Sequence, residues 1–368
     1  MKIEIHLLQN VAPSCLNRDD TNTPKTCEFG GFIRARVSSQ SWKRAVREFF
    51  RAENSVPVGT RTKDLAGRLI ERLGAEVSPE VIEKFVIEAY SKMDGKAAKG
   101  QTAAQTAVLV FISDAEIEEA AACLRAGLSA RDAAPRLRAA RQSADIALFG
   151  RMLAENPERN VDAACQVAHA LSTHAVDLET DFFTAVDDLT AGRDESGAGM
   201  LGTQGFNSAC FYRYALIDRD QLIQNLSGDA ALADRTIAAF LNAFTLALPT
   251  AKQNSHAAQN PPSFGLFVVR EKGVPVSLAN AFANPVRTTS EHADLIGSSI
   301  YCLSRYQAQM QRVYGLYEGA TLAVFHDRED AKALGELKPD YDGSLAGAIA
   351  TVMGRIQGTG GAAGEAAA

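Results

Sequence analysis

The sequence predicts an α+β fold in which strands and helices interleave without a regular repeat. Residues 3–7 alternate apolar and polar side chains, which predicts a half-buried strand at the N-terminus. Residues 42–50 place apolar side chains at positions i, i+3, i+4, i+7 and i+8, which predicts a helix with one buried stripe. With 368 residues and 46% apolar side chains, the chain can bury one or two ordinary cores, so disorder is excluded as its overall state.

The elements follow in order along the chain. After the first strand, residues 10–33 are rich in Pro, Asn, Asp, Thr and Gly, which predicts a long loop. A strand is expected at 33–37, followed by the helix of 42–50, which Ser38 or Ser39 can cap. Further helices are expected at 62–73, 79–92, from Asp114 onward, at 161–174 and at 230–248, and further strands at 106–112, 144–149, 208–217 and 264–270.

Two segments lack a pattern that would build a core. Residues 190–207 are rich in glycine and poor in large apolar side chains, so a mobile surface excursion is expected there. The Gly- and Ala-rich end, residues 357–368, is expected to be disordered.

No apolar run reaches the roughly 18 to 20 residues needed to cross a bilayer. The N-terminus also lacks the apolar stretch and cleavage site of a signal peptide. We therefore expect a cytoplasmic protein without a membrane partner.

Charge is distributed unevenly. The chain has 38 Lys and Arg against 44 Asp and Glu, a net charge of −6, which by itself argues against a nucleic-acid-binding protein. Residues 25–51, however, carry a net charge of +5, so the remainder carries −11. The positive residues are Lys25, Arg34, Arg36, Lys43, Arg44, Arg47 and Arg51.

The spacing of these cations favours an anion site. Lys43, Arg47 and Arg51 are four apart and share a helix face opposite the aromatic stripe. Arg34 and Arg36 alternate on one face of the preceding strand, and residues 38–40 open the helix, where backbone N–H groups favour a phosphate. We interpret this segment as a phosphate-backbone site, with a solvated helix face as the alternative.

Three other motifs suggest chemistry only weakly. Residues 197–202 match G-x-G-x-x-G, but polar residues precede them and a strand follows, the wrong context for a dinucleotide site. Cys165 and His169 are four apart on the expected helix but lack a second pair, so a core role is favoured over a metal site. The acidic pairs 19–20 and 187–188 leave open a metal-dependent ribonuclease using Asp19, Asp20 or Asp187, although such pairs more often cap turns.

Aromatic and polar residues flank the glycine-rich excursion, at 182–184 before it and at 201–206 after it. Such side chains can stack on unpaired bases, as in single-strand binders. A role in the core and in turns is an equally good interpretation.

Several sequence blocks resemble the CasC family, the guide-RNA-binding backbone subunit of the type I-E CRISPR Cascade complex. The blocks occur in order as Pro13–Asp20, Phe29–Gly31, Arg34–Ala45, Ala144–Met152, Ala168–His174, Phe183–Leu189, Leu201–Gln204 and Ser277–Phe282. The sequence departs at Phe32, where a basic residue is expected, and the segment after 283 resembles the family only weakly.

The resemblance implies a hand-shaped subunit. Its palm would have a modified RNA-recognition (ferredoxin-like) fold, with a helical fingers insertion and a thumb hairpin loop. The implied parts are palm at 1–50, 141–189 and 208–356, fingers at 51–140, thumb at 190–207 and a disordered tail at 357–368.

The resemblance also implies the function. Copies of the chain would stack head to tail along a CRISPR RNA and present it for pairing with invading DNA in antiviral defence. The implied partners are CRISPR RNA, the target DNA strand, further copies of the chain, and the CasA large subunit, the CasB small subunit, CasD and CasE. No cofactor and no enzymatic activity are expected.

The candidate RNA-binding residues combine the basic segment with the matched blocks. They are Arg18, Lys25, Arg34, Arg36, Ser38, Ser39, Gln40, Lys43, Arg44, Arg47, Arg151, Met152, Phe183, Thr184, Thr203 and Gln204. By resemblance, the serine, Gln40 and basic positions hold the guide backbone. Met152, Phe183 and Thr184 are implied to lie at a nucleotide that is kinked out of the guide.

Overall fold

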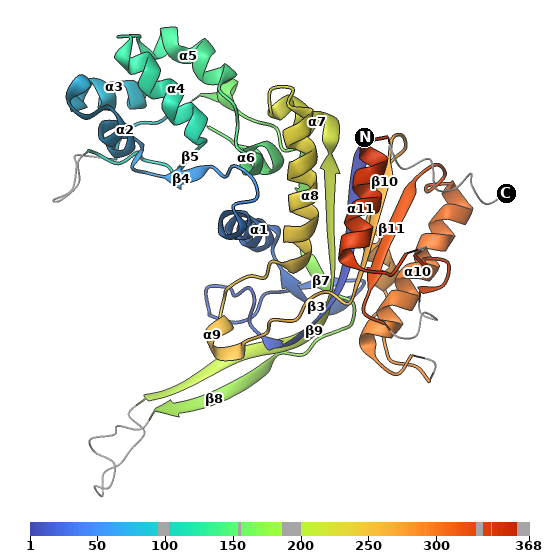
Figure 1. Cartoon of the computed structure of the whole chain (residues 1–368). Helices are drawn as coiled ribbons and strands as arrows, with labels where there is room; N and C mark the ends of the chain where they lie inside the picture. The colour runs from blue at the N-terminus through green and yellow to red at the C-terminus, as the bar shows by residue number, and fades with distance from the viewer. Residues whose placement is uncertain are drawn as a thin grey trace, which may run out of the picture. The chain divides into compact units, whose positions relative to one another are not determined.

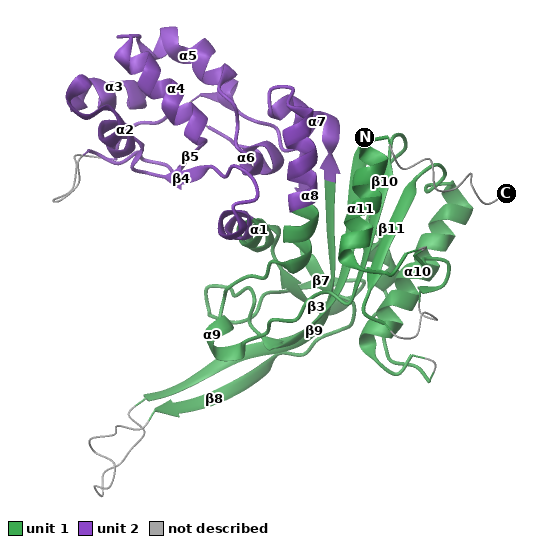
Figure 2. Ribbon diagram, in the orientation of Figure 1, with its two compact units in different colours: residues 1–46, 167–216, 240–368 green, residues 47–166, 217–239 purple. Residues whose placement is uncertain are grey.

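A computed structural model describes residues 1–94, 103–153, 156–185, 200–290, 292–328, 334–339 and 341–358 (Figure 1). The chain forms two compact units (Figure 2). Unit 1 comprises residues 1–46, 167–216 and 240–368, and unit 2 comprises residues 47–166 and 217–239. Residues 190–199 of the predicted thumb and residues 359–368 of the predicted tail lie outside the described residues.

Unit 1 holds most of the main sheet. Its strands are β1 (Lys2–Ser14), β2 (Thr26–Phe29), β3 (Phe32–Val37), β7 (Ala170–Ser172), β8 (Glu179–Ala185), β10 (Phe264–Arg270), β11 (Thr321–His326) and nearly all of β9 (Met200–Asp218). Its helices are α9 (Gln253–His256), the 3₁₀-helix η3 (Ala279–Phe282), α10 (Leu295–Tyr314) and α11 (Leu345–Ile356). The division between the units falls within α1 (Ser39–Glu53), β6 (Cys165–Val167), β9 and α8 (Ala230–Leu246).

Unit 2 is mainly helical. It contains α2 (Leu65–Leu73), α3 (Pro79–Ala89), α4 (Asp114–Arg125), α5 (Ala130–Ala139), α6 (Ala144–Phe149), α7 (Arg219–Asn225), the 3₁₀-helices η1 (Gly74–Glu76) and η2 (Pro157–Arg159), and the two-stranded sheet of β4 (Thr60–Thr62) and β5 (Val110–Ile112). Helices α2 to α5 pack around a core that includes Leu69, Phe85, Ile117 and Leu137.

The main sheet has the order β11-β10-β1-β9-β7-β3-β2, with β6 and β8 also paired to β9. The pairs β1–β10 and β10–β11 are antiparallel, and Ile5 lies opposite Phe267. Helix α10 packs Ile300 and Leu303 into a core with Leu8 and Leu266. The prediction of a mixed fold of strands and helices is confirmed.

The first strand is buried on both faces, so the prediction that it is half-buried is wrong. Glu4 and His6, expected on the polar side, are fully buried. The carboxylate of Glu4 accepts hydrogen bonds from the guanidinium of Arg270 and, over 2.8 Å, from the backbone N–H of Val276. The Nδ1 atom of His6 lies 2.8 Å from the hydroxyl of Tyr212. Partners distant in sequence thus accept or donate hydrogen bonds at the carboxylate of Glu4 and at Nδ1 of His6, which lowers the cost of burying them.

Three other predicted elements are corrected. Residues 144–149 form helix α6 and not a strand; the mostly apolar segment is only six residues long and its one charged residue, Asp145, is buried, so its sequence shows no readable period. Residues 161–174 hold two short strands, β6 and β7, and not a helix. The expected loop at 10–33 is shorter, because β1 runs to Ser14 and β2 pairs with β3 through a turn at Gly30 and Gly31, whose φ values are +62° and +81°.

The apolar stripe of α1 is buried around Trp42, as predicted. The guanidinium of Arg213 lies 3.6 Å from the centroid of the Trp42 ring and 4.6 Å from that of Phe244. Arg213 also donates to Gln9 Oε1 over 2.7 Å and to the carbonyl of Phe244, near the C-terminal end of α8. Among the described residues, no helix is both long and apolar enough to span a bilayer.

Candidate nucleic-acid interface

The loop at 15–25 is tied to the start of α1 by Asn17. The Asn17 side-chain oxygen accepts the backbone N–H of Ser38 over 2.9 Å, and its carbonyl accepts the N–H of Lys25 over 2.9 Å. The carbonyl of Lys25 in turn accepts the N–H of Arg36 over 2.9 Å. These bonds bring the loop, β3 and the N-terminus of α1 into one region of unit 1, which we call the basic rim and define by Arg18, Lys25, Arg36, Gln40, Lys43, Arg44 and His169.

The loop carries an exposed cation held by a turn. Arg18 Nη1 donates to Asn22 Oδ1 over 2.6 Å, and Asn22 has a φ of +67°. The carboxylate of Asp19 accepts the backbone N–H groups of Thr21 and Thr23, each over 3.0 Å. These bonds hold the pKa of Asp19 below its ordinary value. Asp19 therefore caps a turn, whereas Asp187 lies outside the described residues.

Arg36 and His169 form a pair that the sequence did not indicate. Arg36 Nη1 lies 3.0 Å from Nδ1 of His169, and Arg36 Nε donates to the carbonyl of Thr26 over 3.2 Å. Burial, followed by the charges of Arg36 and Lys25, lowers the pKa of His169. The field here is positive, which suits an anion.

The N-terminus of α1 suits an anion as well. Its first turn contains no acidic residue. The Ser38 hydroxyl accepts the backbone N–H of Ser41 over 3.4 Å, so Ser38 is the cap, and it is buried. Gln40 and Arg44 are exposed, while Ser39 and Lys43 are half-buried.

Three of the arginines predicted to bind RNA are buried. Arg34 is fully buried and donates to the carbonyls of Thr173 and Phe282 over 2.9 and 2.8 Å. Arg47 is 5% exposed, and its Nε donates to Asp145 Oδ2 over 2.7 Å. Arg151 is 7% exposed and is paired with Glu116. The expectation that Arg47 lies on an accessible helix face with Lys43 and Arg51 is therefore corrected, because Arg47 is buried in unit 2, where Asp145 accepts a hydrogen bond from its guanidinium.

Strands β8 and β9 form a hairpin whose arms carry the predicted aromatic residues. Phe183 lies opposite Gly202, and Thr184 opposite Leu201. The Phe183 ring covers Gly202, where a Cβ would lie 2.5 Å from Phe183 Cζ. Phe182, Phe183 and Leu201 are 62%, 40% and 62% exposed, so these side chains are not core residues.

The base of the hairpin contains a polar cluster from a distant segment. Gln204 Nε2 lies 2.8 Å from Nε2 of His256, and Lys252 Nζ donates to Gln204 Oε1 over 3.1 Å. Lys252 and Ala257, which flank α9, have φ values of +56° and +48°. Sequence reasoning missed Lys252 and His256 because α9 is short and has no periodic pattern. Thr203, also predicted, is exposed.

Met152 belongs to unit 2 and is 82% exposed. Gly150, two residues earlier, has a φ of +76°. It lies so close to Val161 that a Cβ added to it would be 2.8 Å from the Val161 carbonyl oxygen. The preceding helix α6 holds Asp145, the partner of Arg47. Two residues of the block 144–152 thus have a structural role: Asp145 pairs with Arg47, and Gly150 allows the close approach to Val161.

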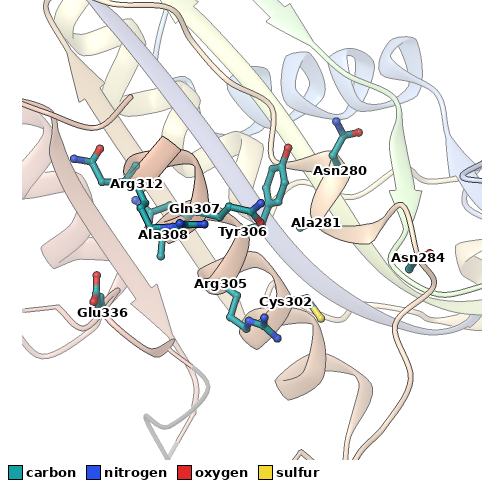
Figure 3. A pocket seen from close by; sticks show the side chains of 12 residues that line it. Asn280, Ala281, Asn284, Cys302, Arg305, Tyr306, Gln307, Ala308, Arg312 and Glu336 are labelled. Atoms are coloured by element: carbon teal, nitrogen blue, oxygen red, sulfur yellow. The ribbon is translucent and has the colours of Figure 1, made fainter. Parts of the chain in front are cut away.

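An open cavity of about 860 Å³ lies in unit 1 along α10 (Figure 3). Arg305, Tyr306 and Arg312 of α10 line it, with Asn280 and Asn284 from the segment around η3. None of the predicted RNA-binding residues, all of which are described, is among the residues lining this cavity.

The predicted metal motifs do not come together. Cys165 and His169 lie in an extended segment and not on one helix face. Among the described residues, no three His, Cys, Asp or Glu side chains are grouped so that they could hold a metal ion.

Comparisons with known proteins extend over nearly the whole chain. The model of the CT1975-like protein family matches residues 3–349. One solved chain, described as "CRISPR RNA-guided surveillance complex, pre-nicking", is 31% identical with a TM-score of 0.82, over 96% of this chain and 100% of that chain. Another, described as "CRISPR RNA-guided surveillance complex", is 28% identical with a TM-score of 0.64, over 97% of this chain and 100% of that chain. No curated protein matches.

Proposed function

Because this chain belongs to the CT1975-like protein family, a family of Cascade proteins, we propose that it is the subunit that binds the guide RNA along the backbone of a type I-E surveillance complex. The observation that carries the proposal is the basic rim of unit 1, set at a helix N-terminus without acidic residues. Its cations suit the phosphates of a single RNA strand.

In this proposal the rim holds the guide by its backbone and does not read its sequence. Arg18, Lys25, Arg36, Lys43 and Arg44 provide positive charge, while Ser39, Gln40 and the backbone N–H groups of α1 provide donors. Guide and target recognise each other by base pairing, so one subunit serves any guide. Arg34, Arg47 and Arg151 are left out of direct contact, because their guanidinium groups are buried and already bonded.

The hairpin and Met152 are proposed to act on the bases. Phe182, Phe183 and Leu201 expose apolar surface that can press on an unstacked base, and Thr184 and Thr203 lie beside them. In this proposal residues 1–50, 141–189 and 208–356 form a palm of the RNA-recognition type, residues 51–140 form the fingers and residues 190–207 form the thumb. Met152 is proposed to meet a kinked nucleotide.

The proposed partners follow from this arrangement. Copies of the chain stack head to tail on CRISPR RNA, which requires two different complementary faces on each copy. The target DNA strand pairs with the presented guide, and the CasA, CasB, CasD and CasE subunits complete the complex. The subunit is proposed to be non-catalytic and to work in the cytoplasm.

Charge reversal in the rim tests the proposal. The double variant Lys43→Glu/Arg44→Glu should prevent guide-bound assembly while the isolated subunit keeps its melting temperature. The matched control is Lys272→Glu/Arg312→Glu, which reverses two exposed cations of unit 1 outside the rim and should leave assembly intact. Assembly of the rim variant at the unaltered level would refute backbone binding at this site, and metal-dependent cleavage of the RNA would favour the ribonuclease alternative.

A further inference from the structure

Met152 is held out to solvent by a segment that is otherwise buried. Met152 is 82% exposed, whereas its neighbours Arg151 and Leu153 are 7% and 4% exposed. Methionine is usually found inside a protein, so an isolated, outward methionine between two buried anchors is unusual. The anchors fix where its side chain can reach.

The backbone around Met152 is fixed on both sides. Arg151 and Val161 exchange backbone hydrogen bonds of 3.0 and 2.9 Å. The N–H of Leu153 donates to Asn160 Oδ1 over 2.6 Å. Met152 therefore lies in a short segment whose backbone is hydrogen-bonded at the residue before it and at the residue after it.

The side chain of Arg151 anchors this stretch to the interior of unit 2. Its Nη1 donates to Glu116 Oε2 over 2.6 Å and to the carbonyl of Phe111 over 3.1 Å. Its Nη2 donates to the carbonyl of Arg159 over 2.9 Å. These contacts connect the residue before Met152 to β5, α4 and η2.

Arg159 completes the cluster from the other end of the segment. Its Nη2 donates to Glu116 Oε1 over 2.9 Å, and its Nη1 donates to the carbonyl of Ala89 over 2.8 Å. The guanidinium lies 4.0 Å from the centroid of the Tyr90 ring. Arg159 is 4% exposed, so the second guanidinium is buried as well.

Glu116 connects the two arginines. It is fully buried, and one oxygen of its carboxylate faces each guanidinium. It also closes the capping box at the start of α4 with Ser113, whose hydroxyl accepts the Glu116 N–H over 3.1 Å. Without this carboxylate, two like charges would remain buried with no counter-ion.

We propose that Glu116 and Arg159 are positioning residues that act through Arg151 to hold Met152 at the guide RNA. This inference rests on the proposed function, because it takes the guide as the partner of Met152. It assigns a role in RNA engagement to two residues that are buried and touch no RNA themselves. A role only in the folding of the whole chain predicts instead that guide contact in both units falls together.

Cross-linking from two positions separates these cases. One subunit carries a photoreactive residue at position 152 (Met152→p-benzoylphenylalanine), and another carries it at position 44 (Arg44→p-benzoylphenylalanine) as a reference in unit 1. Each is combined with Glu116→Gln, which keeps the shape of the side chain but removes its charge. Glu118→Gln is the matched control, since Glu118 lies on the same helix in an exposed ion pair with Arg72. Cross-links are measured on the full chain assembled with guide RNA.

We expect Glu116→Gln to reduce the cross-link from position 152 about tenfold or more, because small misplacements are costly at a contact. The cross-link from position 44 should remain, and Glu118→Gln should change neither. An unchanged cross-link at 152, or an equal loss at both positions, would overturn the positioning role. If Glu116→Gln does not fold, Arg159→Lys, which keeps the charge but loses the guanidinium fork, is read in the same way.

Different results would contradict the proposed function and the positioning role of Glu116 and Arg159. Absence of any cross-link from position 44 in the otherwise unaltered subunit would contradict the proposed function itself. A cross-link from position 44 together with none from position 152 would leave the proposed function standing and overturn only the positioning role.

Discussion

Arg47 Nε donates a hydrogen bond of 2.7 Å to a carboxylate oxygen of Asp145, 98 residues further along the chain. The other oxygen of Asp145 accepts the backbone N–H of Gly59 over 2.8 Å and the hydroxyl of Ser143 over 2.6 Å. Arg47, a cation of the most basic segment, thereby stabilises unit 2 from the inside. Of the cations of α1, Arg47 is buried, whereas Lys43 and Arg44 belong to the basic rim.

The Arg47–Asp145 pair should contribute strongly to the stability of unit 2. Removing one partner leaves an uncompensated buried charge, so Arg47→Ala or Asp145→Ala should lower the free energy of unfolding by about 3–5 kcal/mol. Arg44→Ala, three residues earlier and exposed, should change it by less than about 0.5 kcal/mol. Urea unfolding of the three variants provides the measurement, and a small effect at Arg47 would contradict the pairing.

RNA affinity should depend strongly on salt and weakly on sequence. Each phosphate contact to a single strand contributes about 0.7 to the slope of log affinity against log salt. Arg44→Gln should reduce that slope by about this amount for the guide and for a scrambled RNA alike. Titrations between low and moderate salt measure it, and a flat salt response in the unaltered subunit would rule out backbone-directed binding.

Met152 and Phe183 should matter for the guide and not for folding. Because both side chains are exposed, Met152→Ala and Phe183→Ala should keep the melting temperature within about two degrees. Phe183→Ala should weaken guide-bound assembly by about 1–3 kcal/mol, the value for a base stacked on an aromatic ring, and Met152→Ala should weaken it through the loss of apolar contact. Loss of melting temperature without loss of assembly would be the opposite of what the exposed positions predict.

Acid should destabilise unit 1 through His174. Burial lowers the pKa of His174, whose Nδ1 lies 2.9 Å from the carbonyl of Ala175 and whose Nε2 accepts the N–H of Cys210 over 3.2 Å. The unfolded chain therefore binds a proton more readily than the folded one, so stability is greatest above the ordinary histidine pKa of about 6.5 and falls as pH drops below it. Urea midpoints at pH 7.5 and 5.5 should show this fall, and His174→Gln should reduce it. A midpoint that rises toward pH 5.5 would contradict the assignment.

The sequence predicts best where one local pattern decides the structure. The alternation of residues 3–7, the stripe around Trp42 and the helix pattern from Asp114 onward each specify an element that the structure contains. The segment at 144–149 has too few residues to show a period, so its sequence does not distinguish the helix that forms from a strand. Residues 161–174 form strands because they pair with β9 and β3, which no local pattern reveals.

The sequence likewise predicts only part of the candidate site. The charge of residues 25–51 is visible in the sequence, but the burial of Arg34 and Arg47 depends on the carbonyl of Phe282 and the carboxylate of Asp145, which are far away in the chain. The neighbours of Glu116 in the sequence indicate neither Arg151 nor Arg159, its two partners in the structure. Lys252 and His256 reach the hairpin from a four-residue helix, too short to carry a periodic signal.

The proposed function requires that copies of this chain bind a guide RNA at regular intervals. The most direct test is to purify the protein together with its bound nucleic acid, treat it with ribonuclease and sequence the protected fragments. We expect single-stranded CRISPR RNA protected in regularly spaced fragments, and loss of that protection in Lys43→Glu/Arg44→Glu. Protein free of RNA, or RNA protected without any regular spacing, would contradict it.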